Sequence, residues 1–333
     1  MKKVTILDIA KAANVSKSTV SRVLNGTAAV ASDKKRAVLD ATDRLGFKPN
    51  VVARSLARGR SMTIGVLTQI IGSPFYDTIA QGVIAGLSGS GYSPIFVDGQ
   101  WQQDEEVVGI RALLGRQVDG LVLIGGDVPA EEIVELCGDL PTVIVARQLP
   151  DDVHNCVFMD NVDGGFQATK HLIEHGHRDI AIIKGLAHHA DALDRFAGYR
   201  QALKEAGIPV RDELVLDGDF SADSGVDAVE QMHHRGITFS AIFAANDMTA
   251  FGARLALSRL GIEVPGQVSL VGFDNQMESA YTTPPLTTMH QPARQMGAEA
   301  TKAVLAMIDG EPFESRRYGG RLVVRESVSR LST

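Results

Sequence analysis

Residues Asn14 to Gly26 read NVSKSTVSRVLNG. Val20, Val23 and Leu24 recur at the three-to-four-residue spacing of one helix face, which predicts that this face packs against a neighbouring helix. The hydroxyl, amide and cationic side chains fall on the other face of the same helix: Lys17, Ser18, Ser21, Arg22 and Asn25. Such a face suits a polyanion, because these groups can contact phosphates and base edges.

The residues around this helix predict a helix-turn-helix. Thr5 can cap a preceding helix, Asn14 tolerates the left-handed backbone of a tight turn, and Ser16 can cap the quoted helix. A third helix is expected from Ser32 to Leu45, before Gly46. In a helix-turn-helix, the second helix enters the major groove of DNA and its N-terminal residues meet base edges.

Charge is divided unevenly along the chain. Residues 1–60 hold thirteen Lys and Arg against four Asp and Glu, whereas the other 273 residues hold twenty against thirty-six. The first part therefore carries about +9 and the rest about −16, which gives the formal net charge of −7. A basic head on an acidic body indicates a nucleic-acid-binding module joined to a body with another task.

A short helix is expected directly after the head, in the segment GFKPNVVARSLARGR at residues 46–60. Pro49 suits the first turn of a helix and Gly59 its end. About eight residues make only a marginal helix in water. We therefore expect this helix to fold when it docks on DNA and on a second copy of the chain.

Residues 5–26 and 46–60 resemble the DNA-binding head and hinge of the LacI/GalR family of bacterial repressors, and the resemblance extends over essentially the whole chain. The visible departure is Asn14, where the family usually has Gly. The resemblance implies that Lys17, Ser18 and Arg22 read bases. It implies backbone contacts or positioning for Thr5, Ser16, Thr19, Ser21, Asn25 and Asn50, and minor-groove insertion for Leu56 with Ala53 nearby.

From Met62 onward, strand-like and helical patterns alternate, which predicts parallel sheets covered by crossover helices. The expected fold is an all-α helix-turn-helix head with a hinge helix, followed by an α/β body of two doubly wound parallel-sheet subdomains. This body resembles periplasmic sugar-binding proteins. We expect the head at residues 1–47, the hinge and linker at 48–60, and the body at 61–333. One subdomain should cover about 61–160 plus 291–320, and the other about 161–290 plus the C-terminal end.

Ligands of doubly wound sheets bind beyond the carboxyl ends of the strands. The candidate effector-binding residues are therefore those just past strand ends: Phe75, Tyr76, Trp101, Arg147, Arg195, Phe220, Asn246, Asp274 and Gln291. Positions matching Arg195, Phe220, Asn246 and Asp274 contact the effector in the family. Structural roles remain open for three candidates: Asp274 could cap a loop, Asn246 could cap the following helix, and Trp101 could close a subdomain edge.

Only Arg195 and Arg147 bring positive charge to this set, which favours a neutral sugar or glycoside over a sugar phosphate or nucleotide. The resemblance, closest to galactose- and β-glucoside-responsive members, implies a repressor of sugar-utilisation genes. A sugar inducer would release it from a palindromic double-stranded operator. A corepressor, or a phosphorylated or nucleobase effector on the same fold, is the alternative.

A metal-dependent sugar enzyme is the rival from another class. His171 and His175 stand one helical turn apart with His177 close behind, as metal ligands can. The same run also suits a helix that ends at Gly176. The chain has no nucleophile elbow, Walker loop or Rossmann glycine pattern. We therefore expect no enzymatic activity, no metal site and no cofactor.

Location and assembly follow from simpler patterns. The chain has two cysteines, no apolar run of about 18 residues and no signal-peptide pattern. We therefore expect a cytoplasmic protein without membrane contact, associated with the nucleoid when it is bound to its operator. No leucine heptads follow the strand-like run at 321–327, so we expect a homodimer rather than the tetramer of some relatives.

Overall fold

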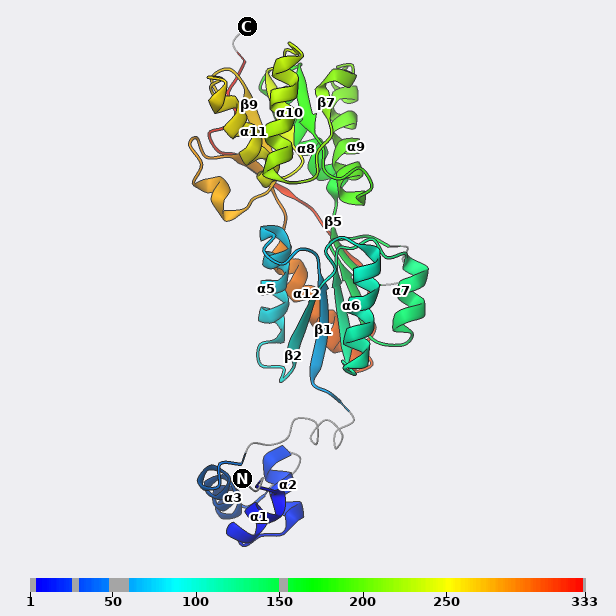
Figure 1. Cartoon of the computed structure of the whole chain (residues 1–333), viewed down its shortest axis with the longest axis vertical. Helices are drawn as coiled ribbons and strands as arrows, with labels where there is room; N and C mark the ends of the chain where they lie inside the picture. The colour runs from blue at the N-terminus through cyan, green and yellow to red at the C-terminus, as the bar shows by residue number, and fades with distance from the viewer. Residues whose placement is uncertain (1–3, 26–29, 48–59, 150–154, 332–333) are drawn as a thin grey trace. The chain divides into compact units, whose positions relative to one another are not determined.

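The computed structural model describes residues 4–25, 30–47, 60–149 and 155–331 (Figure 1). The chain divides into two compact units, Met1–Met62 and Thr63–Thr333. The described residues of the first unit form three helices: α1 Ile6–Ala12, α2 Lys17–Asn25 and α3 Ser32–Arg44. Their common core consists of the buried side chains of Ile9, Ala10, Val20, Val38 and Ala41.

The ends of these helices confirm three local predictions. Thr5 donates from its backbone N–H (2.9 Å) and its hydroxyl (2.7 Å) to the Asp8 carboxylate at the start of α1. Asn14, in the turn that follows, has a left-handed φ of 52°. Ser16 Oγ then accepts from Thr19 N at 3.1 Å and caps α2.

The second unit contains two six-stranded sheets. The first sheet has the order β11-β5-β4-β3-β1-β2, and all of its pairs are parallel. Its strands are β1 Thr63–Thr68, β2 Ser93–Asp98, β3 Gly120–Ile124, β4 Thr142–Val145, β5 Asn155–Met159 and β11 Arg316–Tyr318. Its helices are α5 Pro74–Leu87, α6 Gln103–Gly115, α7 Ala130–Cys137 and α12 Ala293–Ile308. The inner strands are continuous apolar runs, as expected for strands buried on both faces.

The second sheet has the order β12-β10-β9-β8-β6-β7. Its strands are β6 Ile180–Ile183, β7 Val215–Leu216, β8 Ala241–Ala244, β9 Ser269–Asp274, β10 Thr287–His290 and β12 Arg321–Val323. Its helices are α8 Asn161–Glu174, α9 Ala190–Glu205, α10 Ala222–His234 and α11 Asp247–Arg259, with short 3-10 turns at Asp212–Leu214 and Met277–Ala280. The other pairs of this sheet are parallel, whereas the edge strand β12 runs antiparallel to β10.

The chain crosses between the two sheets three times. It passes from β5 to α8, from β10 to α12 and from β11 to β12. Figure 1 shows the second crossing clearly, because the orange α12 lies among the blue and teal elements of the first sheet. The two subdomains are therefore interleaved, and three connections can act as a hinge between them.

Candidate functional site

A cavity of about 210 Å³ lies between the two sheets, at the carboxyl ends of strands of both. Seven of the nine candidate residues line it: Phe75, Tyr76, Trp101, Arg195, Phe220, Asn246 and Asp274. The sheets thus bring together side chains that lie up to 199 positions apart in the sequence, from Phe75 to Asp274. This is the place where doubly wound folds bind ligands.

Arg195 is the buried cation of this cavity, with only 3% of its surface exposed. Its Nε donates to Asn161 Oδ1 at 2.9 Å, and its Nη1 donates to the Ala245 carbonyl at 2.6 Å. The guanidinium also lies 3.9 Å from the centroid of the Phe273 ring. These contacts hold the guanidinium in one position and leave it further N–H donors for a ligand.

Asn246 and Asp274 have structural roles as well as a place in the cavity. Asn246 Oδ1 accepts from Thr249 N at 2.8 Å, so this residue is the N-cap of α11. This is the structural role that the sequence left open for Asn246. Asp274 Oδ1 accepts from Gln291 Nε2 at 2.7 Å. Burial raises the pKa of Asp274, although Arg195 and Gln291 counteract that effect.

Aromatic rings form one wall of the cavity. Tyr76 meets Trp101 edge to face with ring centroids 5.7 Å apart, and Trp101 lies over His189 at 3.7 Å. Trp101 and Phe220 have left-handed φ values of 53° and 69°, which non-glycine residues adopt rarely. Such backbone conformations concentrate at binding sites, and here they turn aromatic rings into the cavity.

Sequence reasoning missed Asp191 and His189, which also line the cavity. Asp191 Oδ2 lies 3.8 Å from Arg195 Nη2, and burial raises the pKa of Asp191 to about 6. Burial lowers the pKa of His189 to about 4, so this imidazole is neutral at neutral pH. The spacing of Asp191 and Arg195, four residues apart on α9, is the signal in the sequence that could have identified the carboxylate.

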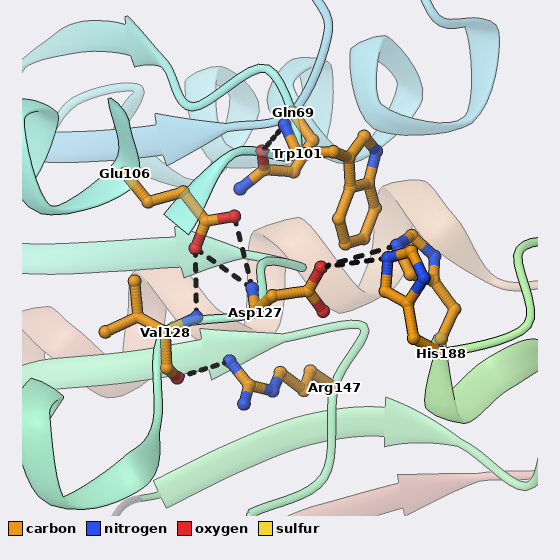
Figure 2. A network of polar contacts seen from close by, with 8 residues as sticks. Gln69, Trp101, Glu106, Asp127, Val128, Arg147 and His188 are labelled. Atoms are coloured by element: carbon orange, nitrogen blue, oxygen red, sulfur yellow. Dashed lines mark hydrogen bonds and ion pairs between the residues drawn. The ribbon is translucent and has the colours of Figure 1, made fainter. Parts of the chain in front are cut away.

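Arg147 and Gln291, the other two candidates, do not line this cavity. Arg147 Nη1 donates to the Val128 carbonyl at 2.8 Å. Arg147 lines a neighbouring cavity of about 120 Å³. Figure 2 shows this network, in which the Glu106 carboxylate accepts from the N–H groups of Asp127 and Val128. Gln291 is buried, and its amide donates to the Asp274 carboxylate. Gln291 thus contacts the cavity around Arg195 through Asp274, whereas Arg147 belongs to the neighbouring cavity.

On the head, α2 presents Lys17, Ser18 and Arg22 to solvent, whereas Val20 is buried. Thr5 and Ser16 are exposed, and Thr19 and Ser21 are half-buried. The side chain of Asn25, and all of Asn50, Ala53 and Leu56, lie outside the described residues. The described part of the head therefore has a polar, partly cationic helix face available for a partner.

Two histidines of the run, His175 and His177, have structural partners. His177 Nδ1 lies 3.0 Å from Ser240 Oγ, and its Nε2 lies 3.1 Å from the Ser329 carbonyl. His175 Nδ1 lies 2.8 Å from the His171 carbonyl, within the last turn of α8. These contacts fit the end of a helix better than a three-histidine metal site.

Comparison with known proteins identifies the two units. Residues 5–50 match the family of bacterial regulatory proteins of the lacI type, and residues 169–328 match the periplasmic binding protein-like domain. Catabolite control protein A of Priestia megaterium is 35% identical over 94% of this chain and 95% of its own length. The chain belongs to the LacI family. The repressor PurR of Vibrio campbellii is 34% identical over 98% of this chain and 99% of its own length.

Solved structures of LacI-family proteins agree with this assignment. The lac repressor dimer bound to operator and an anti-inducer superposes with a TM-score of 0.89, at 28% identity over 98% of this chain and all of that one. The complex of the regulator CelR with cellobiose superposes with a TM-score of 0.74, at 34% identity over 98% of this chain and all of that one. The expected fold class is confirmed.

As a LacI-family member, this protein is a DNA-binding transcriptional repressor with a small-molecule effector, and its family is one of regulators rather than enzymes. None of the helices in the described part of the chain has the length and apolar character that a bilayer span requires.

Proposed function

We propose that this protein is a cytoplasmic, homodimeric repressor of sugar-utilisation genes, and that a neutral sugar or glycoside binds in the cavity around Arg195. The observation that carries the proposal is one buried guanidinium flanked by two carboxylates against an aromatic wall. Carboxylates accept from sugar hydroxyls, Arg195 and Asn246 donate to them, and the rings cover apolar C–H faces.

The charges of the cavity favour a neutral ligand over a phosphorylated one. Among the described lining residues, Arg195 is the sole Lys or Arg, whereas Asp191, Asp219 and Asp274 are acidic. A phosphate usually meets several cationic donors, and here it would meet more negative charge than positive. A compact ligand also suits the volume of about 210 Å³, which is below the roughly 300–1,000 Å³ of sites for larger ligands.

The DNA side of the proposal follows from the head. Each protomer would place α2 in the major groove of one half-site, with Lys17, Ser18 and Arg22 on base edges. The hinge residues Ala53 and Leu56 would act in the minor groove between the half-sites. The operator-bound lac repressor dimer supports this arrangement, and the CelR–cellobiose complex supports a sugar effector.

Release of the operator would follow from a difference in sugar affinity between two arrangements of the interleaved subdomains. The sugar can weaken operator binding only to the extent that it prefers the arrangement that does not bind DNA, typically by about 1–3 kcal/mol. We propose induction, because the galactose- and β-glucoside-responsive members that this sequence resembles are mostly induced by sugars.

Trp101 provides a direct test, because it is the single tryptophan of the chain and lines the cavity. Full-length protein should be titrated with neutral mono- and disaccharides and with one sugar phosphate, with fluorescence and melting temperature as readouts. We expect a neutral sugar to saturate the fluorescence change, raise the melting temperature and weaken operator binding.

Asp274→Asn should weaken the binding of that sugar by about 30-fold or more, since it removes a charged hydrogen-bond acceptor worth roughly 2–3 kcal/mol. Asp217→Asn is the matched control, because the Asp217 side chain is 90% exposed and does not line the cavity. Saturation by the phosphorylated sugar alone, or an unchanged affinity in Asp274→Asn, would contradict the proposal.

A further inference from the structure

Asp127, His188 and His189 form a cluster of potential metal ligands where the two subdomains face each other. Asp127 follows β3 in the first subdomain, whereas the two histidines lie between β6 and α9 in the second. Their ligand atoms all lie within 4.8 Å of one another. Figure 2 shows the Asp127 carboxylate directed at the His188 imidazole.

The two separations from Asp127 to the histidines fit a metal site better than hydrogen bonds. Asp127 Oδ2 lies 3.5 Å from His188 Nε2 and 3.7 Å from His189 Nε2. Hydrogen bonds between such atoms are about 2.7–3.2 Å long. Two ligands of a tetrahedral ion with bonds of about 2.0–2.1 Å are about 3.4 Å apart.

His189 supplies an independent observation. Its side chain is about 5% exposed, and its Nε2 is buried without a hydrogen-bond partner among the residues that the structure describes. Buried ring nitrogens are usually paired, so this atom is free to take a further partner such as a metal ion. This nitrogen lies 3.7 Å from Asp127 Oδ2, and the centroids of the Trp101 and His189 rings are 3.7 Å apart.

The surroundings can complete such a site. The cavity of about 120 Å³ beside the cluster has room for a water molecule in a fourth position. Arg147 lines the same cavity, and its positive charge disfavours a cation there. Its guanidinium donates to the Val128 carbonyl, and the Glu106 carboxylate accepts from the backbone N–H of Asp127. Asp127 and Asp191 are the carboxylates that line this cavity, and Asp127 is the one that lies beside both histidines.

We propose that Asp127, His188 and His189 bind a divalent transition-metal ion, with two imidazole nitrogens and one carboxylate oxygen as ligands. This donor set suits Zn²⁺. Because the ligands come from both subdomains, the bound ion would tie the subdomains together next to the effector cavity. The ion is a structural link in this proposal and takes part in no reaction.

The test is a calorimetric titration of chelator-treated full-length protein with ZnCl₂, with no sugar present. This proposal does not depend on the identity of the effector. We expect one Zn²⁺ per chain. Asp127→Asn and His188→Gln should each weaken binding by at least about tenfold, since even indirect partners of a metal site are worth about 10–100-fold. His188 is 63% exposed, so its replacement should leave the fold intact.

The matched control is the double variant His233→Gln/His234→Gln, which removes another pair of adjacent histidines, at the end of α10. It should bind Zn²⁺ like the unmodified protein. Co²⁺ in place of Zn²⁺ gives a second readout, because its visible absorption should be lost in His188→Gln. Absence of stoichiometric binding, or binding that survives in both cluster variants, would overturn the proposal.

Discussion

Asp247 is a fully buried carboxylate at the start of α11, beside the effector cavity. Its Oδ1 accepts from the Thr288 hydroxyl at 2.6 Å and its Oδ2 accepts from Gln276 N at 2.8 Å. These bonds tie α11 to the ends of β9 and β10. Burial nevertheless raises the pKa of Asp247 well above its ordinary value, with the nearby Asp274 adding to the shift.

The raised pKa of Asp247 makes stability depend on pH. Since the folded state binds this proton more tightly than the unfolded state, the contribution is fully present below about pH 4 and is lost as the pH rises through the folded-state pKa. Asp247→Asn should remove this dependence, because its amide can donate to the Thr288 hydroxyl while its oxygen still accepts from Gln276 N.

Urea unfolding of Asp247→Asn and the unmodified protein between pH 4 and 8 measures this contribution. The variant should gain stability relative to the unmodified protein as the pH rises from 4 to 8, because only the unmodified protein must bury an ionising carboxylate. A difference between the two proteins that stays constant with pH would show that Asp247 is ionised throughout this range.

Arg22 is the exposed cation in the middle of α2. If it reads a base pair, Arg22→Ala should lose about 1–3 kcal/mol of binding to the operator, roughly 5- to 150-fold. Binding to a scrambled duplex should change little at the same salt concentration, since the remaining contacts to phosphate are retained. Equal losses on both duplexes would instead make Arg22 a phosphate contact.

At the scale of elements, the contact between α8 and α9 positions Arg195. A Cβ on Gly198 would lie 2.1 Å from the Val162 carbonyl oxygen, and one on Gly165 would lie 2.3 Å from the Arg195 carbonyl oxygen. Two glycines thus let the helix backbones approach closely, which places Arg195 beside Asn161 of α8. The geometry of the cavity depends on this packing.

Gly198→Ala should force the two helices apart. We expect a loss of about 1–3 kcal/mol in the free energy of unfolding and weaker sugar binding, because Arg195 lies one turn away. Gly115→Ala is the matched control, since a Cβ there meets nothing within 4 Å at the exposed end of α6. The control should be neutral or stabilising by up to about 1 kcal/mol. Equal effects of the two changes in denaturant unfolding would refute the packing argument.

At the scale of the whole molecule, both sheets and the effector cavity lie within the unit Thr63–Thr333. We expect a fragment of residues 63–333 to fold, to bind the sugar with an affinity within about threefold of the full chain, and to lose operator binding. Circular dichroism, Trp101 fluorescence and a DNA-binding assay check the three parts. A fragment that folds but does not bind the sugar would show that the head contributes to the cavity.

Local patterns were sufficient to predict much of this fold. The turn at Asn14, the cap at Ser16 and the buried Val20 follow from spacing and capping preferences of neighbouring residues, and the structure confirms them. The alternation of strands and helices likewise identified two doubly wound sheets. The rule that ligands bind beyond strand ends then selected nine candidate residues, and seven of them line one cavity.

Other features depend on residues that are distant in the sequence. Arg147 and Gln291 also follow strand ends, yet packing turns them toward the Val128 carbonyl and Asp274. The contact of Asp127 with His188 and His189 joins segments about 60 positions apart, on different sheets.

The sequence by itself therefore determined the helix-turn-helix, the two-sheet body and seven of the sixteen residues that line the cavity around Arg195, because each depends on periodicity or on a position at a strand end. Only the tertiary structure decided which side chains meet across the interleaved subdomains, since three chain crossings set those distances.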